Sequence, residues 1–188
     1  MDPFEYVMVI VAIIIGLGIT RILTGIAGLI QHRATVKAYW VHLVWVTAIF
    51  LFMVELWWGW WGLRGTSEWR YLDYFPLFFT PIVLYILSAL AFPDFPDKDR
   101  LDIRDYYYAN HRWFFSIFAL YPITLFVSES LLGPQSVLSW QNYVRLGILA
   151  VLVLCAIIRN AVFHVIVALL LLAFFVFLIA PRLDVIAA

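Results

Sequence analysis

The sequence predicts an all-α fold: a polytopic membrane bundle of about six transmembrane helices, in a single integral membrane domain over residues 1–188. The composition is the first reason, because 65% of the residues are hydrophobic and 13% are charged. Soluble domains have about 45–50% apolar and about 25% charged residues. The mean hydropathy of +0.97 is the second. The third is a set of apolar runs long enough to cross a hydrocarbon core of about 30 Å.

Six apolar segments are expected as helices. Their predicted bounds are 4–30, 38–62, 75–92, 111–132, 140–158 and 161–180. Pro76 is expected in the first turn of the third segment, and Pro81 and Pro122 should kink the third and fourth. Only Arg159 and Asn160 interrupt the apolar residues from 146 to 180. A tight hairpin at these two residues is the preferred interpretation, and five helices with one long final segment are the alternative.

The distribution of basic residues predicts the orientation. The loops after the first, third and fifth segments carry more Lys and Arg than the opposite ends, which places them in the cytoplasm and both termini outside it. Trp and Tyr cluster at both ends of the second segment, as in an interfacial belt. The N-terminal stretch lacks the basic segment of a signal peptide, so the first run is expected to remain as a helix. We expect a multi-pass protein of a bacterial-type inner (plasma) membrane.

The first segment combines small residues with a charge. Small side chains recur at every fourth position, a spacing that lets another helix approach closely: Ala12, Gly16, Thr20, Thr24 and Gly28. The partner could be the second helix or the same helix of another copy. Arg21 lies in this segment on the face of Gly18, Gly25 and Gly28. A charged side chain inside a membrane is costly in free energy unless it pairs with a polar or oppositely charged group.

Two acidic residues are candidates for ion pairs with arginines in or near the membrane. Glu55 in the second segment is a candidate partner for Arg21, although their depths differ by about 12 Å at 1.5 Å per residue. The alternatives are that Arg21 reaches the headgroups along its glycine face, or that both residues line one ion or solute pathway. Glu129 and Arg145, on either side of a short loop, are expected to form a partly solvated structural pair.

Four histidines lie toward the predicted cytoplasmic ends of the helices. His42 and His164 have similar depth and form the best candidate pair for ligating a haem, and a metal or pigment site is a related possibility. No two histidines share a helix at four-residue spacing, so the usual di-metal pattern is missing. Capping a helix end or meeting headgroups is the simpler interpretation of each.

The remaining sequence patterns argue against several classes of site and partner. The stretch from Asp94 to Asn110 has the opening spacing of a calcium loop but lacks its glycine and its final Glu, so it is expected to be a solvated segment. Phosphate-binding, zinc-protease and nucleophile motifs are absent from the sequence, and no enzymatic activity is expected. The zero net charge argues against nucleic acid as a partner, and the single Cys155 permits no internal disulfide.

Three hypotheses for function follow. The first is a non-enzymatic, homo-oligomeric or auxiliary subunit of a larger membrane assembly, with lipid as its surroundings. The second is a small ion or solute channel or carrier that uses Arg21 and Glu55. The third is a redox subunit that binds haem or a pigment through His42 and His164. The pattern resembles that of small multi-pass inner-membrane proteins of bacteria, without a motif specific to a named family.

Overall fold

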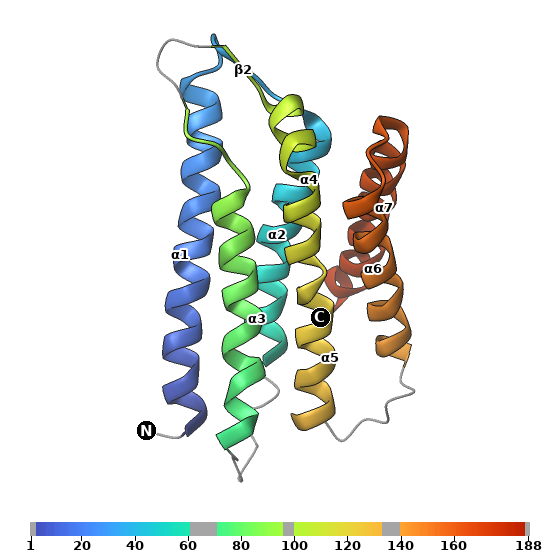
Figure 1. Cartoon of the computed structure of the whole chain (residues 1–188). Coiled ribbons are helices and arrows are strands. Elements are labelled where there is room, and N and C mark those ends of the chain that lie inside the picture. The colour runs from blue at the N-terminus through green and yellow to red at the C-terminus, as the bar shows by residue number, and fades with distance from the viewer. Residues whose placement is uncertain (1–2, 61–70, 96–99, 133–139, 187–188) are drawn as a thin grey trace.

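The computed structural model describes residues 3–60, 71–95, 100–132 and 140–186, apart from the side chains at 3, 71–74, 129, 132 and 178–186. The described chain is all-α, with one two-stranded bridge (Figure 1). The elements in order are α1 (Pro3–Gln31), β1 (Val36–Lys37), α2 (Trp40–Gly59), α3 (Tyr71–Leu90), β2 (Leu101–Asp102), α4 (Ile103–Phe118), α5 (Leu120–Leu132), α6 (Trp140–Ile157) and α7 (Ala161–Ile186).

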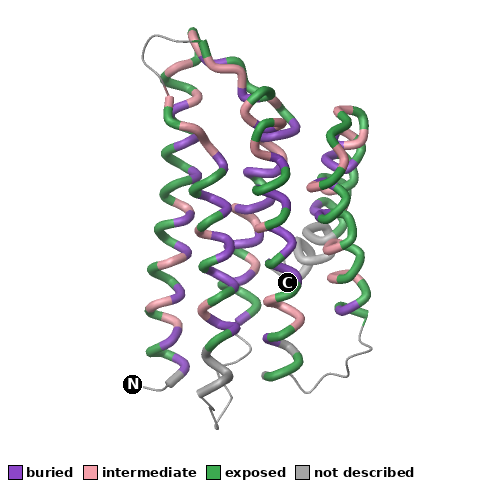
Figure 2. The backbone as a smooth tube through the Cα atoms, in the orientation of Figure 1, coloured by how far each residue is buried: buried purple, intermediate pink, exposed green. Residues whose placement is uncertain are grey.

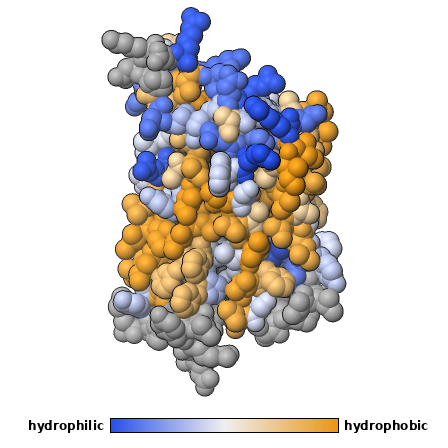
Figure 3. Space-filling model, in the orientation of Figure 1, coloured by the Kyte–Doolittle hydropathy of each residue, from blue (hydrophilic) through white to orange (hydrophobic). Residues whose placement is uncertain are grey.

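Three of the described helices are long and apolar enough to span a membrane, namely α1, α2 and α6. Shorter apolar helical stretches occupy Phe75–Leu90 of α3 and Ala161–Phe177 of α7. Figure 3 shows a hydrophobic band around the middle of the visible face, with hydrophilic residues gathered toward the end that carries β1 and β2. The all-α class is therefore confirmed, and three helices meet the length and composition of a membrane span.

The predicted hairpin between the last two helices is confirmed. The helix α6 ends at Ile157 and α7 begins at Ala161. Asn160 caps α7, because its Oδ1 accepts hydrogen bonds from the backbone N–H groups of Val162 at 2.9 Å and Phe163 at 3.2 Å. A side-chain cap of this kind satisfies N–H groups that have no partner within the helix. The alternative of one long final helix is wrong.

The fourth predicted segment begins too late in the chain. The helix α4 starts at Ile103, not at residue 111, and Asp102 caps it by accepting from the backbone N–H of Arg104 at 2.8 Å. Part of the stretch expected to be solvated is therefore helical, and its Tyr107 is buried. The helix is interrupted at Ala119 before α5. Pro122 lies just beyond and cannot donate to the carbonyl of Phe118, which explains the interruption.

The third helix also begins earlier than predicted. Because α3 starts at Tyr71, Pro76 is inside the helix and not in its first turn, together with Pro81. The buried hydroxyl of Thr80 donates to the carbonyl of Pro76 at 2.9 Å. Helices that contain proline recover some of their lost hydrogen bonding through such Ser or Thr side chains.

The helix α1 makes its most extensive contact with α3 and a smaller one with α2. Its buried residues alternate at intervals of three and four, which places them on one face. They are Phe4, Val7, Val11, Ile15, Gly18, Ile22, Gly25 and Gly28. Of the predicted small-residue stripe, only Gly28 belongs to this face. The stripe therefore does not pack against α2, which was its expected partner within the chain.

A short parallel bridge joins the segment after α1 to the segment after α3. Val36 of β1 pairs with Leu101 of β2, and Lys37 pairs with Asp102. The ammonium Nζ of Lys37 lies 3.2 Å from Oδ2 of Asp102. Residues 36 and 101 are far apart in sequence, so hydropathy could not predict this bridge. It holds two predicted cytoplasmic loops at the same end of the bundle (Figure 1).

The Asp102 carboxylate makes the bridge sensitive to acid. Slight burial raises its pKa, but hydrogen bonds from Arg104 and Lys37 and the Lys37 charge outweigh this, so the pKa lies below the usual 3.8. A carboxylate with a lowered pKa stabilises the fold above its unfolded-state pKa and loses that contribution as the pH falls through the folded-state value. We expect Asp102→Asn to lower the melting temperature only slightly at about pH 6, because Lys37 is largely exposed to solvent, and not to lower it at about pH 2. Thermal unfolding of both proteins across this range checks it, and an equal deficit at both pH values would contradict it.

Candidate functional site

The helix α1 carries an open face opposite the one that packs in the bundle. Ala12, Gly16, Thr20 and Thr24 are all exposed. A Cβ atom added at Gly16 would meet nothing within 4 Å. The Thr20 hydroxyl donates to the Gly16 carbonyl at 2.8 Å, so it needs no other acceptor. Figure 2 shows exposed positions recurring along α1, which lies at one side of the bundle. We call the four residues Ala12, Gly16, Thr20 and Thr24 the outward face.

Arg21 lies at the flank of α1, between its packed face and its outward face. It is exposed and lines a groove formed with the end of α3 and the residues that follow it. Asp94 lines the same groove. The structure therefore places a carboxylate in the same groove as Arg21, Gly25 and Gly28. That carboxylate is Asp94, and Glu55 is not among the lining residues.

Glu55 and Arg145 were predicted to have other charged partners, but both lie near Tyr121. Tyr121 of α5 is buried and interacts electrostatically with both Glu55 of α2 and Arg145 of α6. The guanidinium Nη1 of Arg145 also donates to Oδ1 of Asn142 at 2.7 Å. Glu129 belongs to α5, but its side chain lies outside the described residues, so the predicted Glu129–Arg145 pair remains a prediction.

Three histidines and several tyrosines form a buried polar cluster between α2, α4 and α7. His42, Tyr107 and His164 are 3%, 4% and 0% exposed. The ring of Tyr107 stands between the two histidines, with centroids 5.9 Å from His42 and 5.3 Å from His164. His111 lies on the other side of His164 at 6.1 Å. The predicted pair of His42 and His164 therefore shares one buried site, with Tyr107 in the middle.

Hydrogen bonds fix the imidazole of His164. Its Nε2 lies 2.8 Å from the carbonyl of Ile158, and its Nδ1 lies 2.7 Å from the Tyr107 hydroxyl. Because a carbonyl only accepts, Nε2 donates, and in the neutral imidazole Nδ1 accepts from Tyr107. Both ring nitrogens are engaged, which leaves no lone pair on His164 for a haem iron in this arrangement. Among the described residues, no group of three or more His, Cys, Asp or Glu could hold a metal ion.

His42 is the less satisfied member of the cluster. Its imidazole lies against the backbone of Ala91, and its buried Nε2 has no hydrogen-bond partner among the described residues. The rings of Phe92, Tyr106 and Tyr107 all stand nearly perpendicular to it, with interplanar angles of 82–87°. Aromatic faces are negative and ring edges positive, so T-shaped contacts of this kind are a favoured arrangement of neighbouring rings.

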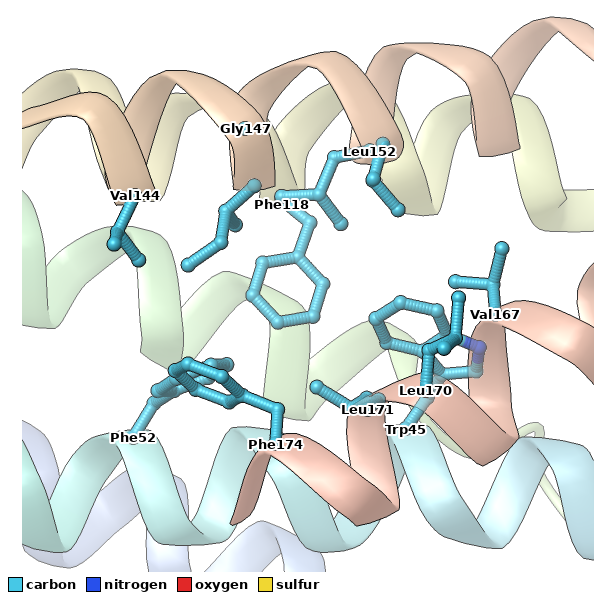
Figure 4. A pocket seen from close by; sticks show the side chains of 12 residues that line it. Trp45, Phe52, Phe118, Val144, Gly147, Leu152, Val167, Leu170, Leu171 and Phe174 are labelled. Carbon is cyan, nitrogen blue, oxygen red and sulfur yellow. The ribbon is translucent and has the colours of Figure 1, made fainter. Parts of the chain in front are cut away.

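An apolar cavity of about 290 Å³ lies beside this cluster, between α2, α4, α6 and α7 (Figure 4). Trp45, Phe52 and Phe118 form part of its wall, and Val144 and Gly147 of α6 face Phe174 of α7 across it. The wall is almost entirely apolar, so the cavity has little to offer a polar ligand. Trp45 connects it to the histidine cluster, because its ring lies 4.8 Å from Phe115, which in turn lies 5.5 Å from His164.

Sequence reasoning missed Tyr107, Asp94 and Tyr121 as members of these sites. Tyr107 had a usable signal, because Ile103, Tyr107 and His111 recur at four-residue intervals after the capping residue Asp102. Asp94 and Tyr121 had none, since their roles depend on helices that are distant in sequence.

Comparisons of this chain with protein families, with curated proteins and with solved structures each find no match. The fold itself defines the class that can be stated: an all-α protein with three described helices long and apolar enough to span a membrane. Its functional assignment rests on the geometry above.

Proposed function

We propose that this chain is a six-pass protein of a bacterial inner membrane, and that it acts without catalysis as an oligomeric or auxiliary subunit of a membrane assembly. The six passes would be α1, α2, α3, the broken pair α4 and α5, α6, and α7. The apolar stretches in α3 and α7 support two further passes, although the described apolar residues of each are fewer than a full span. The shared end of the loops after α1 and α3 supports the alternation of passes.

The orientation belongs to the same proposal. The loops after the first, third and fifth passes carry Arg33, Lys37, Arg100 and Arg159 among other basic residues. Short loops with an excess of Lys and Arg remain in the cytoplasm. Both termini would then lie outside it. A carboxy-terminal reporter active only in the cytoplasm is expected to stay silent, and a signal from it would contradict the orientation.

The single observation that carries the assembly proposal is the outward face of α1. Helices in lipid associate through close packing, and small residues at four-residue spacing allow the backbones to approach. The described bundle uses the other face of α1 and leaves open space at Gly16. Thr20 bonds internally, so the face presents little polarity to a partner. These features support a contact with α1 of a second copy or with a helix of another subunit.

A bulky side chain at Gly16 tests this contact. We expect Gly16→Leu to convert the purified assembly in mild detergent to a smaller species, because leucine would hold the two backbones apart. Light scattering coupled to size exclusion measures the mass. Gly59→Leu is the matched control, since Gly59 also has open space around an added Cβ atom but lies at the end of α2. A wild-type protein that is a stable lone monomer, or a Gly16→Leu variant of unchanged mass, would contradict the proposal.

A further inference from the structure

The groove at the flank of α1 is lined by charged, polar and aromatic residues. Its volume is about 300 Å³, and it runs from Arg21 past Gly25 and Gly28 to His32 on one side. Ser88, Phe92 and Asp94 line the other side. Gly25 lies directly against the ring of Phe92 and Gly28 against the ring of Phe95, and both rings also line the groove. At the His32 end of the groove, the ring of His32 stacks on the ring of Phe95, with centroids 5.6 Å apart and an interplanar angle of 8°.

Two opposite charges in this groove are not used by the described chain. Arg21 is exposed and makes no hydrogen bond or ion pair with any described residue. Asp94 is exposed too and makes none either within the described ranges. The two side chains line one cavity without being paired with each other. A ligand that carries an anion and a cation close together would satisfy both.

The position of Arg21 along α1 points to a lipid as the ligand. Arg21 lies ten residues before Gln31, the end of α1, which corresponds to about 15 Å along the helix. A guanidinium at such depth needs an anion or a route to the headgroups. The polar residues of the groove supply that route, and they end at Asp94 and His32, close to the basic loops. A planar guanidinium binds phosphate through two parallel hydrogen bonds.

We propose that this groove binds the headgroup of phosphatidylethanolamine, with its phosphate on Arg21 and its primary ammonium on Asp94. The phosphate is the part that draws the headgroup toward Arg21. The carboxylate of Asp94 accepts hydrogen bonds from a primary ammonium, which the quaternary ammonium of choline cannot donate and which a glycerol headgroup lacks. The inference rests on the proposed membrane embedding of α1. Of the four residues of the outward face, only Thr24 also lines the groove, and Gly16, which tests the assembly contact, does not, so the two proposals are tested separately.

The test is a measurement of retained lipid. The full-length protein is reconstituted with equal amounts of phosphatidylethanolamine, phosphatidylglycerol and phosphatidylcholine, extracted in mild detergent, and analysed by native mass spectrometry. We expect preferential retention of phosphatidylethanolamine by the wild type. Arg21→Gln should lower the retention of all phospholipids by roughly tenfold, because the phosphate loses its charged partner. Asp94→Asn should keep total retention but abolish the preference for the ethanolamine headgroup.

The control variants show whether the retained lipid occupies this groove. Arg33→Gln removes a positive charge near the same end of α1, but Arg33 donates to the Ile30 carbonyl and does not line the groove, so retention should not change. If Arg21→Gln does not fold, Asp94→Asn and Arg21→Lys still test the site, because lysine keeps the charge without the paired hydrogen bonds and should weaken retention. Displacement of the lipid by millimolar inorganic phosphate would identify a soluble phosphate as the ligand and overturn the proposal.

The outcome also separates this inference from the membrane proposal. If the wild type fails to float with vesicles, the embedding itself is wrong. If it floats but retains the three lipids in proportion to supply, or if Arg21→Gln retains them as the wild type does, only the lipid site is wrong.

Discussion

Replacing Gly25 with leucine is expected to destabilise the bundle, whereas the same replacement at Gly16 on the same helix is not. A Cβ atom at Gly25 would overlap the ring of Phe92. That ring cannot simply turn away, because its other neighbours are the imidazole of His42 at 5.8 Å and the ring of Phe95 at 6.3 Å. Inserting bulk into a packed contact costs about 1–3 kcal/mol, and a leucine adds three further carbons. We expect a loss of stability at or above the upper end of this range.

The measurement is the free energy of unfolding in mixed micelles, with near-ultraviolet circular dichroism reporting the aromatic packing around Phe92. Gly16→Leu serves as the control under dilute, micelle-rich conditions that keep the wild type monomeric, because its side chain would then enter open space and should change stability by no more than about 0.5 kcal/mol. The two variants should also differ in mass, since only Gly16 belongs to the outward face. If Gly25→Leu were as stable as the wild type, the close contact of α1 with the residues after α3 would be wrong.

This pair of glycines shows what the sequence could predict about α1 and what it could not. Length and apolarity predicted the helix. Which face packs could not be predicted, because the helix is apolar on nearly all sides and lacks the polar face that marks the exterior of a soluble helix. Small residues at four-residue spacing indicate a contact but do not say whether it lies within the chain. The structure assigns Gly18, Gly25 and Gly28 to the interior and leaves Gly16 open.

The predicted start of the fourth helix, residue 111, was wrong for a different reason. Hydropathy assigned the residues before 111 to a loop, because Arg104, Asp105 and three tyrosines lower the average. The periodic pattern was nevertheless present, with Ile103, Tyr107, His111 and Phe114 on one buried face. A polar helix of this kind is recognised by its period and its cap and not by its mean hydropathy.

The charged pairs depend on tertiary structure. Glu55 was suggested as a partner for Arg21 because it is an acidic residue in the next predicted helix, although the two depths differ; in the structure Glu55 is near Tyr121, and Asp94 is in the groove of Arg21. Asp94, and not Glu55, lines that groove because α1 packs mainly on α3, which follows α2 in the chain. Helices that are neighbours in sequence are not always the closest neighbours in space, and hydropathy carries no information about which of them pack together.

The hydrogen bond between Tyr107 and His164 is expected to hold α4 and α7 together, and its removal should give the second large effect. Both side chains are buried, and the Tyr107 oxygen lies 2.7 Å from Nδ1. His164→Leu would leave the hydroxyl of Tyr107 and the carbonyl of Ile158 without this partner. A buried polar group left unsatisfied costs about 1–3 kcal/mol, so we expect a loss of a few kcal/mol in the free energy of unfolding. Tyr107→Phe should cost less, because it keeps the aromatic packing.

A double-mutant cycle separates this bond from its surroundings. Interhelical hydrogen bonds in membrane proteins average about 0.6 kcal/mol in such cycles and reach about 1.7 kcal/mol. The bond between Tyr107 and His164 should fall near the upper value, because the fixed acceptor on Ile158 orients the imidazole before Tyr107 meets it. Tyr143→Phe is the control, since Tyr143 is exposed on α6 and should show no coupling with His164→Leu. A coupling energy of zero between Tyr107 and His164 would mean that the aromatic contacts with Phe115 and Tyr108, and not the hydrogen bond, determine how α7 sits against α4.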